Sequence, residues 1–221
     1  MLSAAAVETV VFFLLAAIAL FASAQRLDWP MAWAFLLVNA AISGIGFLML
    51  APEVIRERSR LLSGARGEDV VLSGVMSIFL FPATWIVCGL DARHGWSPSI
   101  PPAVQCATLA LFAIGYGVGL WAARANPFFS TVVRIQTERG HHVIDSGPYA
   151  LVRHPGYAGG LIAHLALPIA LGSLWGLVPA ALGGALMILR ALYEEQTLAD
   201  ELPGYRDYMQ RVPWRLIPRV W

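Results

Sequence analysis

Long apolar runs without charged residues alternate along the chain with short polar segments. Three of these runs are bounded by charged side chains at both ends, at residues 9–25, 29–52 and 70–90, and a fourth, 103–123, follows a cluster of prolines and ends before Arg124. A helix needs about 20 apolar residues to cross the hydrocarbon core of a bilayer. The pattern therefore predicts a transmembrane helix in each of the four runs.

The last apolar run, residues 155–189, is too long for one crossing. At 1.5 Å per residue a single helix of this length would extend about 50 Å, whereas the hydrocarbon core is about 30 Å thick. Pro168 and the stretch Leu-Gly-Ser-Leu-Trp-Gly at 171–176 are typical of a chain reversal. We therefore expect two antiparallel helices here, the first of them short, and about six transmembrane helices in total.

The arginines test this count, because all 15 basic residues are arginine. With six spans, 13 of them lie on the side that holds both termini, in the segments 56–66, 124–153 and 190–219, and only Arg26 and Arg93 lie opposite. Five spans would divide them 8 to 7. Cytoplasmic loops carry the excess of positive residues, so six spans with both termini in the cytoplasm are favoured.

Composition excludes several classes of protein. The chain is 58% hydrophobic and only 13% charged, with a mean hydropathy of +0.65, whereas an average soluble domain is about 25% charged. A net charge of +1 leaves no basic excess for nucleic acid. The exclusive use of arginine is typical of a GC-rich genome and favours a bacterial plasma membrane. The stretch Ala-Ser-Ala at 22–24 resembles a signal-peptide cleavage site, but no positive residue precedes it, so we expect no cleavage.

The polar segment that follows the fourth span is unusually rich in arginine, histidine and tyrosine. We expect a short extended piece at 131–136, a turn at 138–140, and a single helical turn at 149–153. The chain thus divides into four N-terminal transmembrane helices, 1–123, and an integrated remainder, 124–221, with the polar segment, the helical hairpin and a tail. One interpretation of the polar segment is an interfacial anchor at the lipid headgroups.

The helix that ends the hairpin carries charged residues near its polar end. Arg190 and Glu194 are four positions apart, so they share a helix face and can pair, while Glu195 faces elsewhere. Such groups are functional candidates when they face the interior of a bundle. The alternative is an exposed ion pair of little energetic value. Five histidines are present, but none of the spacings typical of metal-binding helices occurs, so we expect no metal.

Two motifs in this half of the chain resemble a known family. The first runs from His142-Val143-Ile144 through Gly147-Pro148-Tyr149 to Arg153-His154-Pro155, Tyr157 and Gly159. The second is Arg190-(3)-Glu194-Glu195-(2)-Leu198, followed by Tyr-(2)-Tyr-(3)-Val-Pro. Together they are similar to the isoprenylcysteine carboxyl methyltransferases, their prokaryotic relatives and the wider group of membrane phospholipid methyltransferases. The resemblance covers about the last 100 residues. It implies S-adenosylmethionine bound from the cytosol and a lipophilic or prenylated substrate that enters from the bilayer.

The resemblance also implies roles for individual residues. The implied cofactor-binding residues are Arg134, His141, His142, Val143, Ile144, Tyr149, His154, Pro155, Gly156, Tyr157 and Glu194. Arg134 stands where eukaryotic members tend to have glutamine, which leaves its contact open between the cofactor carboxylate and lipid headgroups. The implied catalytic residues are Arg153, Arg190, Glu194 and Glu195. The expected protein is an all-α integral membrane protein with a cytoplasmic cofactor-binding segment.

Methyl transfer from a sulfonium is an in-line displacement that depends mainly on positioning. A carboxylate acceptor is ionised at pH 7 and needs a cationic holder, for which Arg153 and Arg190 are the candidates. An amine acceptor would also need a base, and Glu194, Glu195 or His154 are suited to that role. The residues favour a carboxylate slightly. The alternatives are a phospholipid N-methyltransferase, an NADPH-dependent membrane reductase of a sterol or enone, and a non-enzymatic membrane protein.

Overall fold

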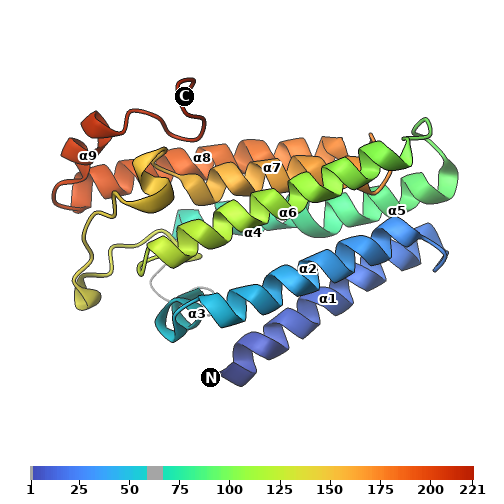
Figure 1. The fold of residues 1–221 in the computed structure, drawn as a ribbon, viewed down its shortest axis with the longest axis horizontal. Coiled ribbons are helices and arrows are strands. Elements are labelled where there is room, and N and C mark those ends of the chain that lie inside the picture. Colours follow the sequence, from blue (N-terminus) through green and yellow to red (C-terminus); the bar gives the residue numbers. More distant parts are fainter. Residues whose placement is uncertain (1, 59–66) are drawn as a thin grey trace.

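The computed structural model describes residues 2–58 and 67–221, so Arg60 and Arg66 lie outside the described residues (Figure 1). The described chain is all helical, without strands. In chain order its elements are α1 (Leu2–Ala24), α2 (Pro30–Met49), α3 (Pro52–Arg58), α4 (Gly67–Ile78), the π-helical turn η1 (Phe79–Ala83), α5 (Thr84–His94), α6 (Pro102–Ala125), the 3-10 turns η2 (Thr137–Arg139) and η3 (Gly147–Ala150), α7 (Pro155–Ala170), α8 (Leu177–Glu201) and α9 (Tyr205–Arg211).

Five helical stretches of the described chain are long and apolar enough to cross a membrane. They are formed by α1, by α2, by α4 with η1 and α5, by α6 and by α8. The predicted hairpin is confirmed, because α7 ends at Ala170 and α8 begins at Leu177. Its first helix, α7, has 16 residues and lies beside α6 and α8 (Figure 1). At about 24 Å it is the short member of the hairpin.

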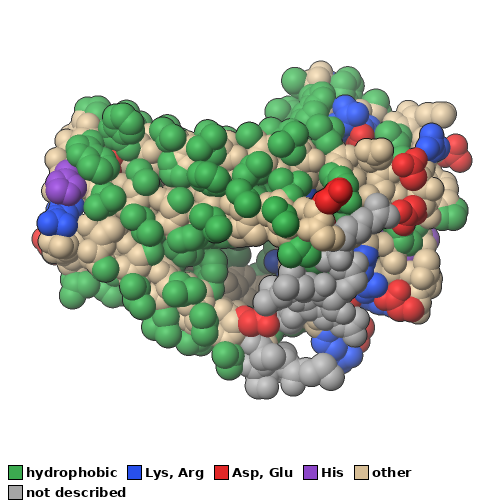
Figure 2. Space-filling model, turned by 180° about the vertical axis from the view of Figure 1, so that it is seen from behind, with side chains coloured by type: hydrophobic (Ala, Val, Ile, Leu, Met, Phe, Trp, Pro, Cys, Tyr) green, Lys and Arg blue, Asp and Glu red, His purple; other side chains and the backbone are tan. Residues whose placement is uncertain are grey.

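The two ends of the bundle differ in polarity. The N-terminus, α3, the segment between α6 and α7, and α9 lie at one end, on the left in Figure 1. Hydrophobic side chains cover the length of the helices, while most of the charged side chains gather at that same end (Figure 2). Leu14, Ile18 and Leu37 are each more than half exposed, as expected for side chains that face lipid rather than water.

A buried aspartate holds the turn of the hairpin at the opposite end. Asp91, near the end of α5, accepts hydrogen bonds from the Ser97 amide at 2.8 Å and from the Ser173 hydroxyl. The Leu174 amide in turn donates to the Ser97 hydroxyl at 2.8 Å. These bonds satisfy backbone and hydroxyl groups that would otherwise be unpaired, and they join the end of α5 to the α7–α8 turn.

Helices α6 and α7 cross with almost no space between their backbones. A Cβ atom at Gly115 of α6 would lie 2.5 Å from the carbonyl oxygen of Gly159 and 2.7 Å from the amide nitrogen of Ala163, both in α7. Small residues at such crossings allow close helix packing in a membrane. The close contact fixes the N-terminal part of α7. This part of the helix carries Pro155, Tyr157 and Gly159 of the first motif.

Gly115→Ala is therefore expected to lower the free energy of unfolding by about 1–3 kcal/mol, because the two helices must separate to admit the methyl group. Gly117→Ala, on the same helix, is the matched control, since a Cβ there would meet nothing within 4 Å. Unfolding by SDS titration in mixed micelles measures both variants. Equal stability of the two variants would contradict the assigned packing.

Candidate functional site

A cavity of about 340 Å³ opens at the polar end of the bundle, a volume within the range of small-molecule sites. Its walls come from the end of α3, α4, the segment between α6 and α7, the start of α7, α8 and α9. All of the sequence-predicted site residues except Glu195 line it. These residues are Arg134, His141, His142, Val143, Ile144, Tyr149, Arg153, His154, Pro155, Gly156, Tyr157, Arg190 and Glu194. The structure therefore brings the two motifs to one place.

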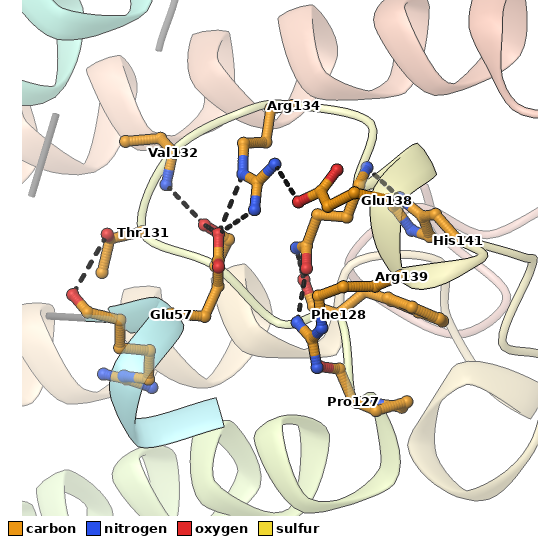
Figure 3. Close-up of polar contacts among 12 residues, drawn as sticks. Glu57, Pro127, Phe128, Thr131, Val132, Arg134, Glu138, Arg139 and His141 are labelled. Atoms are coloured by element: carbon orange, nitrogen blue, oxygen red, sulfur yellow. Dashed lines mark hydrogen bonds and ion pairs between the residues drawn. The ribbon is translucent and has the colours of Figure 1, made fainter. Parts of the chain in front are cut away.

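The segment between α6 and α7 is held mainly by side-chain bonds to its own backbone (Figure 3). Gln136 is fully buried and its amide donates to the Phe128 carbonyl at 2.7 Å, while Arg139 donates to the Pro127 carbonyl at 2.9 Å. The turn expected at 138–140 is confirmed, since η2 is followed by Gly140 with φ of 65°. The extended piece expected at 131–136 forms no strand in the described chain.

The helical turn expected at 149–153 was wrong in position. The structure has a 3-10 turn, η3, at Gly147–Ala150. It begins earlier because Pro148 suits the first turn of a helix. It ends before Arg153 because the Arg153 amide donates to the Trp214 carbonyl of the C-terminal tail at 2.9 Å.

Arg134 joins this segment to α3. Its guanidinium lies 2.8–2.9 Å from one carboxylate oxygen of the buried Glu57 and donates to Glu138 at 2.7 Å (Figure 3). Two carboxylates thus neutralise the charge of Arg134. The geometry gives this arginine a role in holding the wall of the cavity against α3.

Glu195 lies behind the cavity wall, at the centre of a buried ion cluster. One oxygen accepts from Arg153 at 2.7 Å and lies 3.4 Å from His154, and the other accepts from Arg215 at 2.9 Å. Arg153 also donates to the Val212 carbonyl at 2.8 Å. The cluster joins α8 to the start of α7 and to the C-terminal tail, so Arg153 and Glu195 are placed as positioning residues.

A second buried cluster joins α8 to α4. Arg190 binds both carboxylate oxygens of Asp69, at 2.8 and 3.2 Å. The spacing of four residues suggested a direct pair between Arg190 and Glu194, but the two side chains are joined through Tyr157. Instead Arg190 donates to the Tyr157 hydroxyl at 3.1 Å, and that hydroxyl donates to Glu194 at 2.7 Å. The series of contacts Asp69–Arg190–Tyr157–Glu194 fixes the carboxylate of Glu194. Of Glu194 and Glu195, only Glu194 faces the cavity.

Sequence reasoning missed Asp69, which is only 1% exposed. In the sequence it only marks the charged end of an apolar run. The aromatic residues of the tail were also missed as lining residues. Tyr205 and Tyr208 of α9 both line the cavity, and the Tyr208 hydroxyl donates to the Tyr149 carbonyl at 2.7 Å. The Tyr205 hydroxyl is buried without a hydrogen-bond partner among the described residues.

His141 predicts a pH dependence. Burial is the main cause that lowers the pKa of His141 to about 4, and the nearby charges of His142 and Arg134 contribute less. The Nδ1 atom of His141 accepts a hydrogen bond from the backbone amide of Gln136 at 3.2 Å. The unfolded chain takes up the proton near pH 6.5. Stability should therefore fall as pH drops from about 6.5 to about 4, because only the unfolded state is protonated in that window.

The measurement is the melting temperature between pH 7.5 and 4.5 for the wild type and for His141→Gln. The variant should lose less stability than the wild type over this range. His94→Gln, at an exposed histidine at the end of α5, is the control and should retain the wild-type slope. Identical slopes for the wild type and His141→Gln would exclude His141 as the cause of the loss of stability at low pH.

Comparison with known protein families gives a match on this half of the chain. Residues 104–203 match the phospholipid methyltransferase family. The matched segment runs from α6 to the end of α8 and contains most of the cavity lining.

Two curated relatives are also similar. The chain is 35% identical to Delta(14)-sterol reductase TM7SF2 of Mus musculus over 100 residues, which is 44% of this chain and 24% of that protein. It is 32% identical to the lamin-B receptor of Drosophila melanogaster over 168 residues, 67% of this chain and 22% of that protein. The chain thus spans about a quarter of the length of these relatives.

Proposed function

We propose that this protein is a membrane-embedded methyltransferase that uses S-adenosylmethionine and methylates a lipophilic acceptor. The observation that carries the proposal is the position of Glu194. It lies within the segment that matches the phospholipid methyltransferase family and, among the described residues, is the one acidic side chain that lines the cavity, where the rings of Tyr149 and Tyr205 also lie. A carboxylate beside aromatic rings favours a cationic ligand, and the methyl donor carries a sulfonium and an ammonium.

The cavity residues fit the methyl donor in three further respects. The backbone of residues 142–144 makes no backbone hydrogen bond within the described chain, which leaves donors and acceptors for an adenine edge. The unpartnered Tyr205 hydroxyl is available to a ligand in the same cavity. Phe128 and Tyr149 offer rings for stacking. A ligand that bonds to these groups would offset the cost of leaving them unpaired.

When bound, the methyl donor supplies an activated methyl group on a positively charged sulfur. The residues of this chain orient it. The Tyr157 hydroxyl accepts a hydrogen bond from Arg190 and donates one to Glu194, so the Glu194 carboxylate is held in one position. The ion cluster around Glu195 fixes the start of α7, where His154 and Tyr157 enter the cavity wall. This arrangement suits a reaction that depends on alignment.

A reductase is the second candidate, because one similar protein is named as a sterol reductase. For this chain the corresponding cofactor would be NADPH. A dinucleotide brings several phosphate charges that need cations. Arg134, Arg153 and Arg190 line the cavity, but each is paired with a carboxylate. Among the described residues, Arg58 is the one arginine of the cavity lining without an ion pair, and a single cation is too few for the several phosphate charges of a dinucleotide, so the charges favour the methyl donor.

We further propose a carboxylate as the methyl acceptor, as in the isoprenylcysteine carboxyl methyltransferases. An ionised carboxylate needs no base, whereas a phospholipid amine would require proton removal, for which Glu194 is the candidate. The charged end of the bundle would face the cytoplasm of a bacterial cell. A hollow in the apolar flank beside this end is visible in Figure 2 and would admit a lipid.

The test is incubation of the purified full-length protein with methyl-labelled S-adenosylmethionine and three acceptor pools: prenylcysteines, phospholipids and a total lipid extract. We expect label in a lipid-extractable product. A base-labile product would identify a methyl ester, and a base-stable product would identify N-methylation. No transfer to any pool, with NADPH-dependent reduction of an enone or sterol instead, would overturn the proposal.

A further inference from the structure

Arg58, the last residue of α3, lines the cavity. It lies outside both motifs and outside the segment that matches the methyltransferase family. Its guanidinium carbon is 5.4 Å from the centre of the Phe129 ring. The same ring lies beside the start of α7, where a Cβ at Gly156 would be 2.9 Å from it. Phe129 therefore lies between Arg58 and the part of the cavity that is built by the first motif.

Arg58 differs from the other three arginines that line the cavity. Arg134 is paired with Glu57 and Glu138, Arg153 with Glu195, and Arg190 with Asp69. Within residues 2–58 and 67–221, no carboxylate forms an ion pair with Arg58. Among the described residues of the cavity lining, three guanidinium groups are thus neutralised by carboxylates and one, that of Arg58, is not.

The surroundings of Arg58 are those of a cavity rather than of open solvent. The residue as a whole is exposed, but it is part of the cavity lining, and burial there lowers the pKa of its guanidinium, with a smaller opposing effect from Tyr116 of α6. A charge in such a position loses part of its hydration, and the cation–π contact with Phe129 offsets only part of that loss. An anion that binds there would offset this loss with a charge-assisted hydrogen bond.

The cavity wall also carries apolar side chains that suit a hydrocarbon chain. Met76 of α4 and Met187 of α8 both line it. Methionine side chains are flexible and adapt to apolar ligands of varied shape. An unpaired cation and an adaptable apolar wall in one cavity are the two features that an anionic amphiphile requires.

We propose that the acceptor is an anionic amphiphile whose carboxylate or phosphate binds Arg58 and whose apolar part lies against Met76 and Met187. The proposal rests on the proposed function, because it takes the remainder of the cavity as the methyl-donor site. Under this proposal Arg58, which belongs to neither motif, recognises the charge of the acceptor. Arg153 and Arg190 do not, because their donors are engaged within the protein.

The experiment uses full-length protein in a nonionic detergent at pH 8 and three probes of equal chain length: dodecanoate, dodecyl phosphate and dodecanol. Binding is followed by tryptophan fluorescence. The wild type should bind at least one of the two anions about 10-fold more tightly than the alcohol. A preference for dodecanoate would indicate a carboxylate acceptor, and a preference for dodecyl phosphate would indicate a phospholipid headgroup.

Arg58→Gln should abolish the preference for the anion, and Arg58→Lys should retain most of it. Arg56→Gln is the matched control, since Arg56 lies on the same short helix, is exposed and does not line the cavity. It should bind all three probes like the wild type. An unchanged preference in Arg58→Gln, or its equal loss in Arg56→Gln, would overturn the proposal.

Binding of S-adenosylhomocysteine separates this proposal from the proposed function. Arg58→Gln should bind it as tightly as the wild type does. A loss of about 10-fold in that variant would make Arg58 a ligand of the methyl donor and would overturn the assignment to the acceptor. If the wild type itself fails to bind S-adenosylhomocysteine but shows an Arg58-dependent preference for anions, the proposed function fails while anion recognition stands.

Discussion

Asp69→Ala is expected to lower the free energy of unfolding by about 3–5 kcal/mol. The substitution leaves Arg190 charged and buried without its bidentate partner, and it also removes the acceptor of the Val133 amide, which lies 2.9 Å from Asp69. Unfolding by SDS titration in mixed micelles measures the loss. Glu68→Ala, at the exposed neighbour on the same helix, is the control and should change stability little.

The double variant Asp69→Ala/Arg190→Ala completes the test. Because it leaves no unpaired charge, it should be less destabilised than the sum of the two single variants. If Asp69→Ala were as stable as Glu68→Ala, the buried pair between α4 and α8 would be contradicted.

Glu194→Gln is expected to reduce kcat/KM for methyl transfer by about 100-fold while the protein remains folded. Glutamine keeps the size of the side chain and an acceptor for the Tyr157 hydroxyl, but it removes the negative charge that faces the cavity. Initial rates with labelled S-adenosylmethionine measure the effect, and the melting temperature checks the fold.

Glu68→Gln is the control for the loss of one acidic residue outside the cavity and should retain wild-type rates. Tyr157→Phe should give a smaller loss than Glu194→Gln, because it frees the carboxylate without removing its charge. Wild-type activity in Glu194→Gln would remove this residue from the site.

The membrane helices could be predicted from the sequence because hydrophobicity alone decides where a chain crosses a bilayer. The hairpin at 155–201 followed from length, since no single helix of that size fits one crossing. Helix bounds within the polar segment were less predictable. The position of η3 depends on a backbone bond from Arg153 to Trp214, which lies far along the chain.

The cavity lining followed largely from the two motifs, but the partners of its charged residues did not. Asp69 lies 121 positions from Arg190, and an acidic residue at the end of an apolar run is equally typical of a helix end at the membrane surface. Arg153 and Arg190 were candidates for holding the acceptor, yet most of their donors are engaged within the protein. Arg58 could not be singled out from the sequence. Only the tertiary structure reveals which of the described arginines in the cavity lining forms no ion pair with a carboxylate.

The central claim is that the cavity holds a methyl donor rather than a reducing dinucleotide. Isothermal titration of the purified full-length protein with S-adenosylhomocysteine and, separately, with NADPH tests it most directly. We expect saturable binding of S-adenosylhomocysteine, weakened in Glu194→Gln and unaffected by NADPH. Saturable binding of NADPH without binding of S-adenosylhomocysteine would contradict it.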